Sequence, residues 1–120
     1  MVKTRIVVDI SDAKVSSDPS DVLVTYSLGS CIGVCLYDPV THIGGMLHYQ
    51  LPSSKMDEER ARSKPLMFAD TGMALLLNKM TTMGANKKRM HVRLAGGAAM
   101  ATGLALVACV AGLGATACSK

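Results

Sequence analysis

Aromatic residues are scarce in this 120-residue chain, which has no tryptophan, one phenylalanine and three tyrosines. A protein that binds nucleic acids is expected to combine a basic stripe with aromatic side chains that stack on bases. Here the net charge of +4 is modest, and basic and acidic residues are interleaved, as in residues 55–64. The composition therefore disfavours a nucleic-acid-binding protein.

The sequence shows neither a secretory leader nor a disulfide framework. Its charged first residues lead into a short apolar run that is interrupted at Asp9 and Asp12, unlike a signal peptide. We therefore expect a cytoplasmic protein with reduced cysteines. Cys31 and Cys35 are not followed by a second close pair of ligands, so we expect no metal. We also expect no cofactor. The other two cysteines are Cys109 and Cys118.

Charge is absent from residues 94–119. Such a length raises the question of a transmembrane helix. Alanine and glycine dominate the segment, however, and glycine disfavours a helix by about 1 kcal/mol relative to alanine. We expect a packed segment that does not insert into a membrane, with a sequence foreign to the domain as the alternative. The length predicts a single domain, residues 1–120.

Periodicity predicts several strands and one helix. Val15 stands alone before a polar turn, and the charged residues 53–64 are typical of a mobile surface loop. A helix is expected over about residues 65–83, because Pro65 suits a first turn and Gly84 suits a stop. The predicted strands cover residues 5–10, 22–26, 31–37, 45–50 and 90–94.

A cysteine and a histidine flank one predicted hairpin. Cys31 follows the turn 28–30, His48 lies on the next extended segment, and residues 38–44 would fold the two segments together. Cysteine chemistry needs a nucleophile, a proton carrier and donors for an oxyanion, for which the backbone N–H groups of Ser30 and Cys31 are candidates. Ser27 is a substrate contact or, more simply, a turn former.

The pair alone leaves a purely structural interpretation open. A cysteine in an apolar stretch is often a small buried hydrophobic residue, and periodicity does not determine the hairpin register that sets the distance from Cys31 to His48. Of the remaining candidates, we expect Cys35 in the core, His42 in solvent and His91 on the surface.

Several motifs in order resemble the CheD family of chemotaxis proteins, the chemoreceptor glutamine deamidases. The resemblance runs from about residue 21 to residue 100, whereas residues 101–120 lack the family's Asn-rich stretch, further helix and closing strands. The motifs are Val-Thr-Tyr-Ser-Leu-Gly-Ser-Cys (24–31), Leu-Tyr-Asp-Pro (36–39), Gly-Gly-Met-Leu-His (44–48) with Leu-Pro (51–52), Phe-Ala-Asp (68–70) and Gly-Gly-Ala-Ala-Met (96–100).

The resemblance implies an α+β fold, a layered α/β sandwich with mixed or antiparallel sheets. It implies that Cys31 is the nucleophile, His48 the catalytic histidine and Thr25 its support. The reaction would hydrolyse glutamine side-chain amides on chemoreceptors through a thioester. Two alternatives remain: an adaptor without chemistry that binds the CheC phosphatase or receptors, and a thiol protease or transferase.

Overall fold

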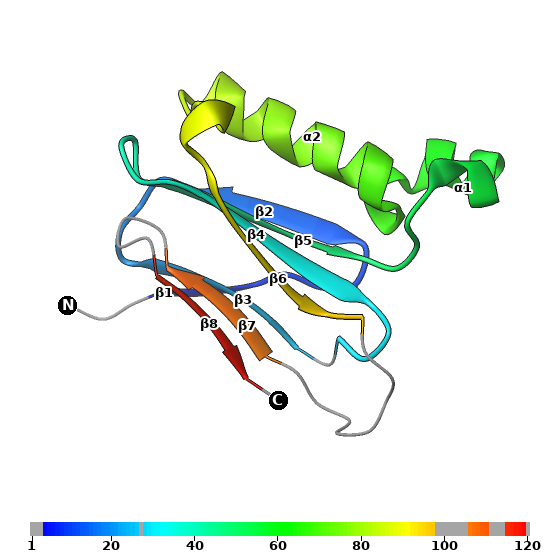
Figure 1. Cartoon of the computed structure of the whole chain (residues 1–120), viewed down its shortest axis with the longest axis horizontal. Helices are drawn as coiled ribbons and strands as arrows, with labels where there is room; N and C mark the ends of the chain where they lie inside the picture. The colour runs from blue at the N-terminus through cyan, green and yellow to red at the C-terminus, as the bar shows by residue number, and fades with distance from the viewer. Residues whose placement is uncertain (1–3, 27, 98–105, 111–114, 120) are drawn as a thin grey trace.

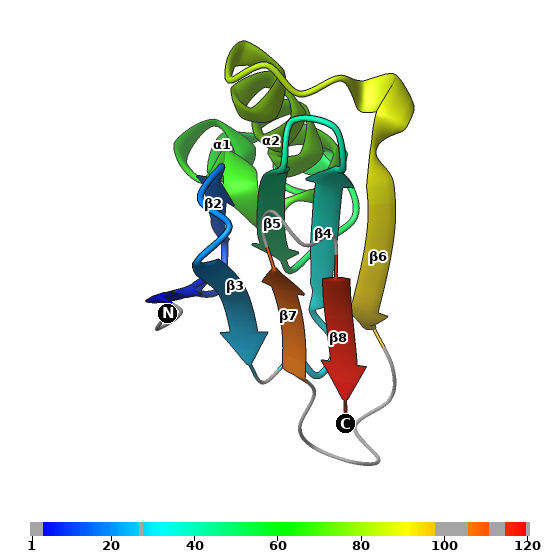
Figure 2. The same ribbon diagram turned by 90° about the vertical axis from the view of Figure 1, so that its left-hand side faces the viewer.

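Two stacked four-stranded sheets and a helix layer form the structure, a computed structural model (Figures 1 and 2). It describes residues 4–26, 28–97, 106–110 and 115–119, with the last two segments described by their backbone. Sheets and a main helix in layers confirm the expected α+β sandwich.

The outer sheet has the strand order β1-β3-β7-β8, in which β1 and β3 are parallel and the other pairs antiparallel. The central sheet has the order β2-β5-β4-β6 and is antiparallel throughout. In the outer sheet the bounds are β1 Thr4–Val7, β3 Asp21–Tyr26, β7 Leu106–Val110 and β8 Ala115–Ser119. In the central sheet they are β2 Asp12–Ser16, β4 Ile32–Asp38, β5 Ile43–Tyr49 and β6 His91–Gly96.

The central sheet is buried on both faces along β4 and β5, as the apolar run predicts for β4. One face packs on the helix α2 (Ala69–Thr82). The helix comes close because glycine lies at the contact: a Cβ on Gly45 would lie 2.7 Å from Met80 Sδ. The other face, which includes Cys35 and Met46, packs on Leu23 of the outer sheet. Cys35 is therefore a core residue, as expected.

The charged segment 53–64 is not a loop, which corrects the prediction. It forms the 3₁₀ turn η1 (Ser54–Met56) and the helix α1 (Glu58–Ser63). Asp57 caps α1 by accepting a hydrogen bond from the Arg60 amide. The carboxylate of Asp70 accepts hydrogen bonds from the backbone and side chain of Ser54, which ties η1 to α2. Capping and one long-range contact thus order a segment without apolar periodicity.

Element boundaries differ in three further places. Residues around Val15 form β2, because they pair with Gly45 and its neighbours in β5, a partner that the local sequence does not reveal. The first strand ends at Val7 rather than at residue 10. The predicted helix is divided: Pro65–Met67 is a 3₁₀ turn, Phe68 is extended, and α2 follows.

An ion pair between a buried carboxylate and a partly exposed arginine closes the end of the hairpin between β4 and β5. Asp38, which is fully buried, accepts hydrogen bonds from Arg89 Nε at 3.1 Å and Nη2 at 2.8 Å. The backbone N–H groups of Val40 and Asn86 donate to the same carboxylate. These donors hold the pKa of Asp38 well below its usual range, Arg89 contributing most. The pair fixes the segment before β6 to the hairpin.

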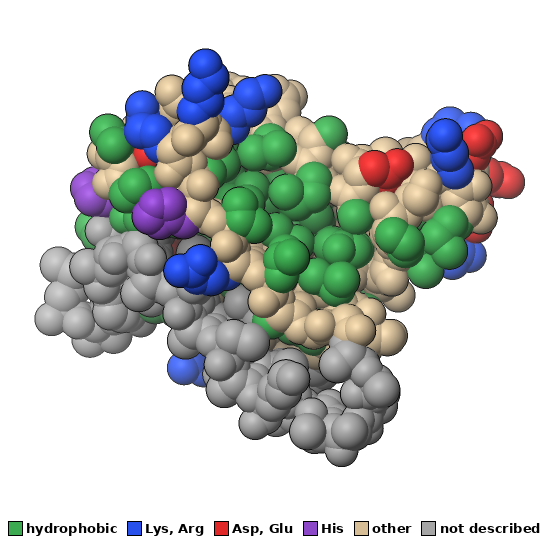
Figure 3. All heavy atoms as spheres, viewed as in Figure 1, with side chains coloured by type: hydrophobic (Ala, Val, Ile, Leu, Met, Phe, Trp, Pro, Cys, Tyr) green, Lys and Arg blue, Asp and Glu red, His purple; other side chains and the backbone are tan. Residues whose placement is uncertain are grey.

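The strand β6 forms one edge of the central sheet, and its side chains are largely exposed. His91 lies on the surface, as predicted, and His42 is exposed in the turn of the hairpin. Val92 and Leu94 are half or more exposed and pair with residues of β4 that face α2. Figure 3 shows an apolar surface below α2 on this side of the molecule.

Strands β7 and β8 lie within the uncharged segment. β7 pairs with β3 and β8 pairs with β7, so the described residues 106–110 and 115–119 add two strands to the outer sheet. Within the described part of the chain, no helix combines the length and apolar character needed to cross a bilayer.

Candidate active site

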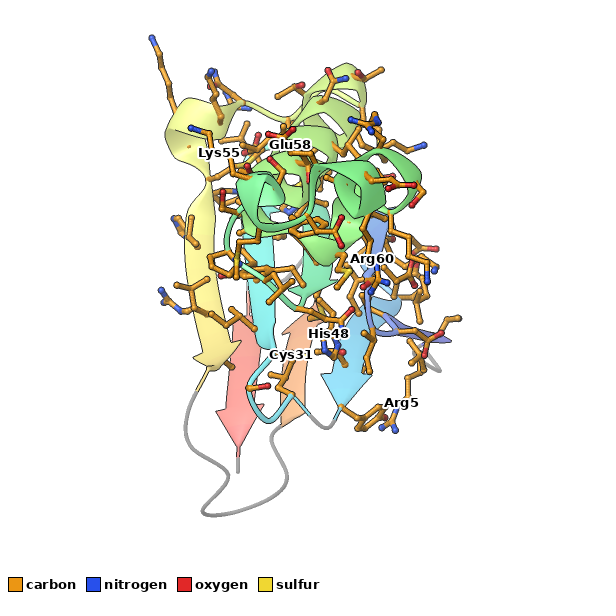
Figure 4. All side chains as sticks on the ribbon, turned by 90° about the vertical axis from the view of Figure 1, so that its right-hand side faces the viewer. Arg5, Cys31, His48, Lys55, Glu58 and Arg60 are labelled. Atoms are coloured by element: carbon orange, nitrogen blue, oxygen red, sulfur yellow. The ribbon has the colours of Figure 1, made fainter. Side chains whose placement is uncertain are left out.

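The hairpin places Cys31 and His48 on one face of the central sheet. His48 pairs with Gly33, and Cys31 lies two residues before Gly33, immediately before β4. Because side chains alternate along a strand, Cys31, Gly33 and His48 share the face toward the outer sheet. Their order in the register makes Cys31 a diagonal neighbour of His48. In Figure 4 the two labelled side chains lie close together, with Lys55 and Glu58 farther away by α1.

A hydrogen-bonded relay holds the imidazole of His48. Thr25 Oγ1 lies 2.8 Å from His48 Nδ1 and 2.7 Å from the carbonyl oxygen of Val8. A threonine hydroxyl has one hydrogen, and the Val8 carbonyl can only accept it. Thr25 therefore accepts a hydrogen bond from Nδ1–H, which places the proton of neutral His48 on Nδ1.

This tautomer leaves Nε2 of His48 as an unprotonated base. Nε2 is buried and has no hydrogen-bond partner among the described residues. An unpartnered polar atom in a protein interior is costly and invites a functional explanation. The relay therefore presents a basic nitrogen on the face that carries Cys31.

Glycines allow the backbone to come close at this site. A Cβ on Gly33 would lie 3.3 Å from Thr25 Cγ2, so its missing side chain leaves room for Thr25 beside His48. Gly97, with φ of +72°, donates its N–H to the Cys31 carbonyl at 2.9 Å. A Cβ on Gly96 would lie 2.3 Å from that carbonyl oxygen. The Gly96-Gly97 pair thus holds the backbone of Cys31.

Burial favours the neutral forms of both reactive groups. It raises the pKa of the Cys31 thiol, which is partly buried. It lowers the pKa of His48, although the negative charge of Asp9 opposes this change. Burial thus favours the thiol form of Cys31 and the neutral imidazole of His48.

One of the two predicted oxyanion donors, the Cys31 N–H, is already hydrogen-bonded within the turn before Cys31. Gly29 has φ of +51°, a conformation that glycine adopts readily. The Cys31 N–H donates to the Leu28 carbonyl at 2.6 Å, so it is committed within the turn. Ser30 is exposed, and its N–H remains a predicted donor. Ser27 lies outside the described residues.

Three residues near His48 were not identified from the sequence. Asp9 acts on His48 through its charge. Ser11 donates its backbone N–H to the His48 carbonyl at 2.8 Å and its hydroxyl to Gln50 Oε1 at 2.7 Å. The alternation along 45–50 puts Gln50 on the face of His48, but no local signal pairs it with Ser11, 39 positions away.

The chemistry that this arrangement supports is nucleophilic. A thiol with a neighbouring base can attack a carbonyl carbon and form a thioester. Among the described residues, no group of three or more histidine, cysteine or acidic side chains could hold a metal ion.

Comparison with known proteins gives a consistent family. Residues 50–115 match the family model described as CheD chemotactic sensory transduction. The chain is 52% identical over 95 residues to a probable chemoreceptor glutamine deamidase CheD 1 of Syntrophus aciditrophicus, covering 79% of this chain and 59% of the relative.

Two further relatives carry the name probable chemoreceptor glutamine deamidase CheD. The protein of Solibacter usitatus is 50% identical over 96 residues, which cover 80% of this chain and 57% of the relative. That of Desulforamulus reducens is 46% identical over 100 residues, which cover 83% of this chain and 58% of the relative. The chain thus spans somewhat less than three fifths of the length of these relatives.

Proposed function

Because this chain belongs to the CheD family, we propose that it deamidates chemoreceptors, converting protein-bound glutamine side chains to glutamate with release of ammonia. The observation that carries the proposal is the buried relay from Val8 through Thr25 to His48, which leaves Nε2 as a base on the face of Cys31. The roles of these residues are proposed because the family-model match begins after His48.

In the first step Cys31 Sγ attacks the carbon of the glutamine carboxamide while His48 Nε2 takes the thiol proton. A carbon–sulfur bond forms, and the carbonyl electron pair moves to the oxygen. The imidazolium then protonates the amide nitrogen, and ammonia leaves as the thioester forms. This general acid matters because an amide nitrogen leaves poorly without a proton; such a group contributes about 10²–10⁴-fold to the rate.

Water completes the reaction. His48 Nε2 accepts a proton from water as its oxygen attacks the thioester carbon, and the Cys31 sulfur leaves and recovers a proton. The net change is one carboxamide and one water converted to one carboxylic acid and one ammonia. Thr25 keeps the Nδ1 proton in place throughout, so that Nε2 is the nitrogen that exchanges protons.

The neutral forms of Cys31 and His48 fit this sequence of steps. Since burial raises the pKa of Cys31 and lowers that of His48, the proton moves to Nε2 during attack rather than before it. Substrate binding would exclude water and place the carboxamide carbon within reach of Sγ. A cytoplasmic location is part of the proposal.

The decisive experiment is mass spectrometry of a chemoreceptor cytoplasmic fragment after incubation with the protein. We expect a mass gain of about 1 Da for each glutamine converted to glutamate, and its loss in Cys31→Ser, because a serine hydroxyl is a much weaker nucleophile at neutral pH. Cys35→Ser is the matched control: it places a hydroxyl in the core, so it should lower stability but keep activity.

Near-normal activity of Cys31→Ser would refute the assignment of the nucleophile. If the wild-type protein produced no mass gain but bound CheC or receptor fragments, the adaptor function would replace the deamidase. Cleavage of the receptor fragment instead of deamidation would indicate a thiol protease.

A further inference from the structure

The register of the central hairpin places Gln50 at the end that carries the proposed nucleophile. The paired residues of β4 and β5 end with Ile32 opposite Tyr49, so Cys31 precedes the last pair on one segment and Gln50 follows it on the other. By alternation Gln50 also projects from the same face as His48. Gln50 and His48 therefore lie at the end of the hairpin where Cys31 precedes β4.

Both ends of Gln50 are held in place although the residue is exposed. Its backbone N–H donates to the Met67 carbonyl at 2.8 Å. Its side-chain Oε1 accepts a hydrogen bond from the Ser11 hydroxyl at 2.7 Å. The carboxamide is thus oriented, and its Nε2 hydrogens have no acceptor among the described residues.

Ser11 itself is kept in an unusual conformation. Its φ is +57°, in the left-handed region that residues other than glycine rarely adopt. Its N–H donates to the His48 carbonyl, so one residue ties the turn before β2 to both His48 and Gln50. Such strain persists where the surrounding structure determines it, and it is concentrated at functional sites.

A donor is needed where Gln50 lies. Attack by Cys31 moves negative charge onto the carboxamide oxygen, and an active site of this kind supplies N–H groups to that oxygen. The Cys31 N–H, the nearest backbone donor, is committed to Leu28. Side-chain amides of asparagine and glutamine serve this purpose in other enzymes.

The geometry points to Gln50 as a substrate-binding residue of the deamidase. Its Nε2–H donates a hydrogen bond to the oxygen of the target carboxamide, in the bound substrate and as charge develops during attack. No proton is transferred, because Gln50 remains a neutral amide. This inference rests on the proposed deamidation, and it assigns a specific donor to the proposed site.

The test compares Gln50→Met with wild type, using the chemoreceptor fragment and mass spectrometry. Methionine has a similar length but no N–H, so we expect kcat/KM to fall about tenfold, as for one hydrogen bond. Asn78→Met, which exchanges an exposed amide on α2, is the control and should remain at the wild-type rate. Ser11→Ala, which frees Oε1, should give a smaller loss than Gln50→Met.

A second measurement separates binding from folding. Methyl methanethiosulfonate transfers a methylthio group to the Cys31 sulfur and releases methanesulfinate. This reaction involves no carboxamide oxygen, so its rate should be the same in wild type and Gln50→Met. A fall in both rates would show that the substitution disturbs the thiol and would overturn the inference. Gln50→Glu keeps an oxygen for Ser11 but adds negative charge, so it should lose more activity than Gln50→Met.

Two outcomes distinguish this inference from the function on which it rests. Equal kcat/KM in Gln50→Met and an active wild type would refute the role of Gln50 and leave the deamidase intact. An inactive wild type would refute both. Gln50 is the only glutamine in the chain, so a mass gain of about 1 Da in the peptide that contains Gln50 would identify it as a substrate and overturn its role as a donor.

Discussion

Thr25→Val tests the relay that determines the tautomer of His48. Valine has nearly the same shape as threonine, so the substitution removes the hydroxyl without leaving a cavity. Two buried groups then lose their partners: the Val8 carbonyl and the His48 Nδ1–H. Each unsatisfied buried group costs about 1–3 kcal/mol. We therefore expect the free energy of unfolding to fall by about 2–6 kcal/mol.

Thr25→Ser is the matched control, because serine keeps the hydroxyl and both hydrogen bonds. It removes only Cγ2, the methyl group nearest to Gly33. One buried methyl group is worth about 1 kcal/mol. Urea denaturation followed by circular dichroism should therefore rank wild type above Thr25→Ser and Thr25→Ser above Thr25→Val, with similar m-values.

The tautomer gives an independent measurement. Nitrogen NMR of His48 should report a proton on Nδ1 in wild type and Thr25→Ser, and a loss of this preference in Thr25→Val. Deamidation should fall in parallel, because a proton on Nε2 removes the base that accepts the proton from Cys31. If Thr25→Val were as stable as Thr25→Ser and kept the proton on Nδ1, the relay would not determine the tautomer.

Three further predictions concern the site and its support. Iodoacetamide should label Cys31 faster than the buried Cys35, and His48→Ala should slow this labelling. The labelling rate of Cys31 should still rise above pH 9, because burial raises the thiol pKa. A labelling rate that is constant below pH 7 would instead indicate a preformed thiolate. Arg89→Ala leaves the Asp38 carboxylate short of its main partner, so urea denaturation at neutral pH should show a loss of about 2–4 kcal/mol. Because the folded protein lowers the pKa of Asp38, the ionised carboxylate adds stability above the unfolded pKa near 3.8, and this stability is lost as the pH falls below that value. The acid transition of Arg89→Ala should therefore move to higher pH. An unchanged transition would contradict the role of the ion pair. Gly33→Ala places a Cβ against Thr25 of the outer sheet, so the free energy of unfolding should fall by about 1–3 kcal/mol in the same denaturation assay. If the variant were as stable as wild type, the two sheets could move apart at this position without cost.

Much of the fold can be predicted from local pattern. The apolar run 31–37 gives a strand buried on both faces, and the alternation along 45–50 assigns His48 and Leu47 to opposite faces. Residues 38–44 join them in an antiparallel hairpin, as expected. The glycine-poor, methionine-rich stretch before Gly84 forms the main helix, although its start lies beyond Phe68. In each case the signal lies within a few residues of the structure that it predicts.

Other elements depend on partners that are distant in the sequence. The strand β2 contains a single large apolar residue, Val15, and exists as a strand because it pairs with β5. The segment 53–64 becomes helical through caps and the contact between Ser54 and Asp70. Neither the pairing nor the contact leaves a periodic pattern that a sequence window could detect.

The candidate site divides in the same way. The sequence by itself determined the residue types and the hairpin: a cysteine after a glycine turn, and a histidine on the facing strand. Only the tertiary structure decided the register that makes Cys31 a neighbour of His48, and the packing of the two sheets that brings Thr25 and the Val8 carbonyl to Nδ1. The physical reason is that side-chain chemistry is carried by each residue, whereas tautomer, burial and pKa depend on which distant groups surround it.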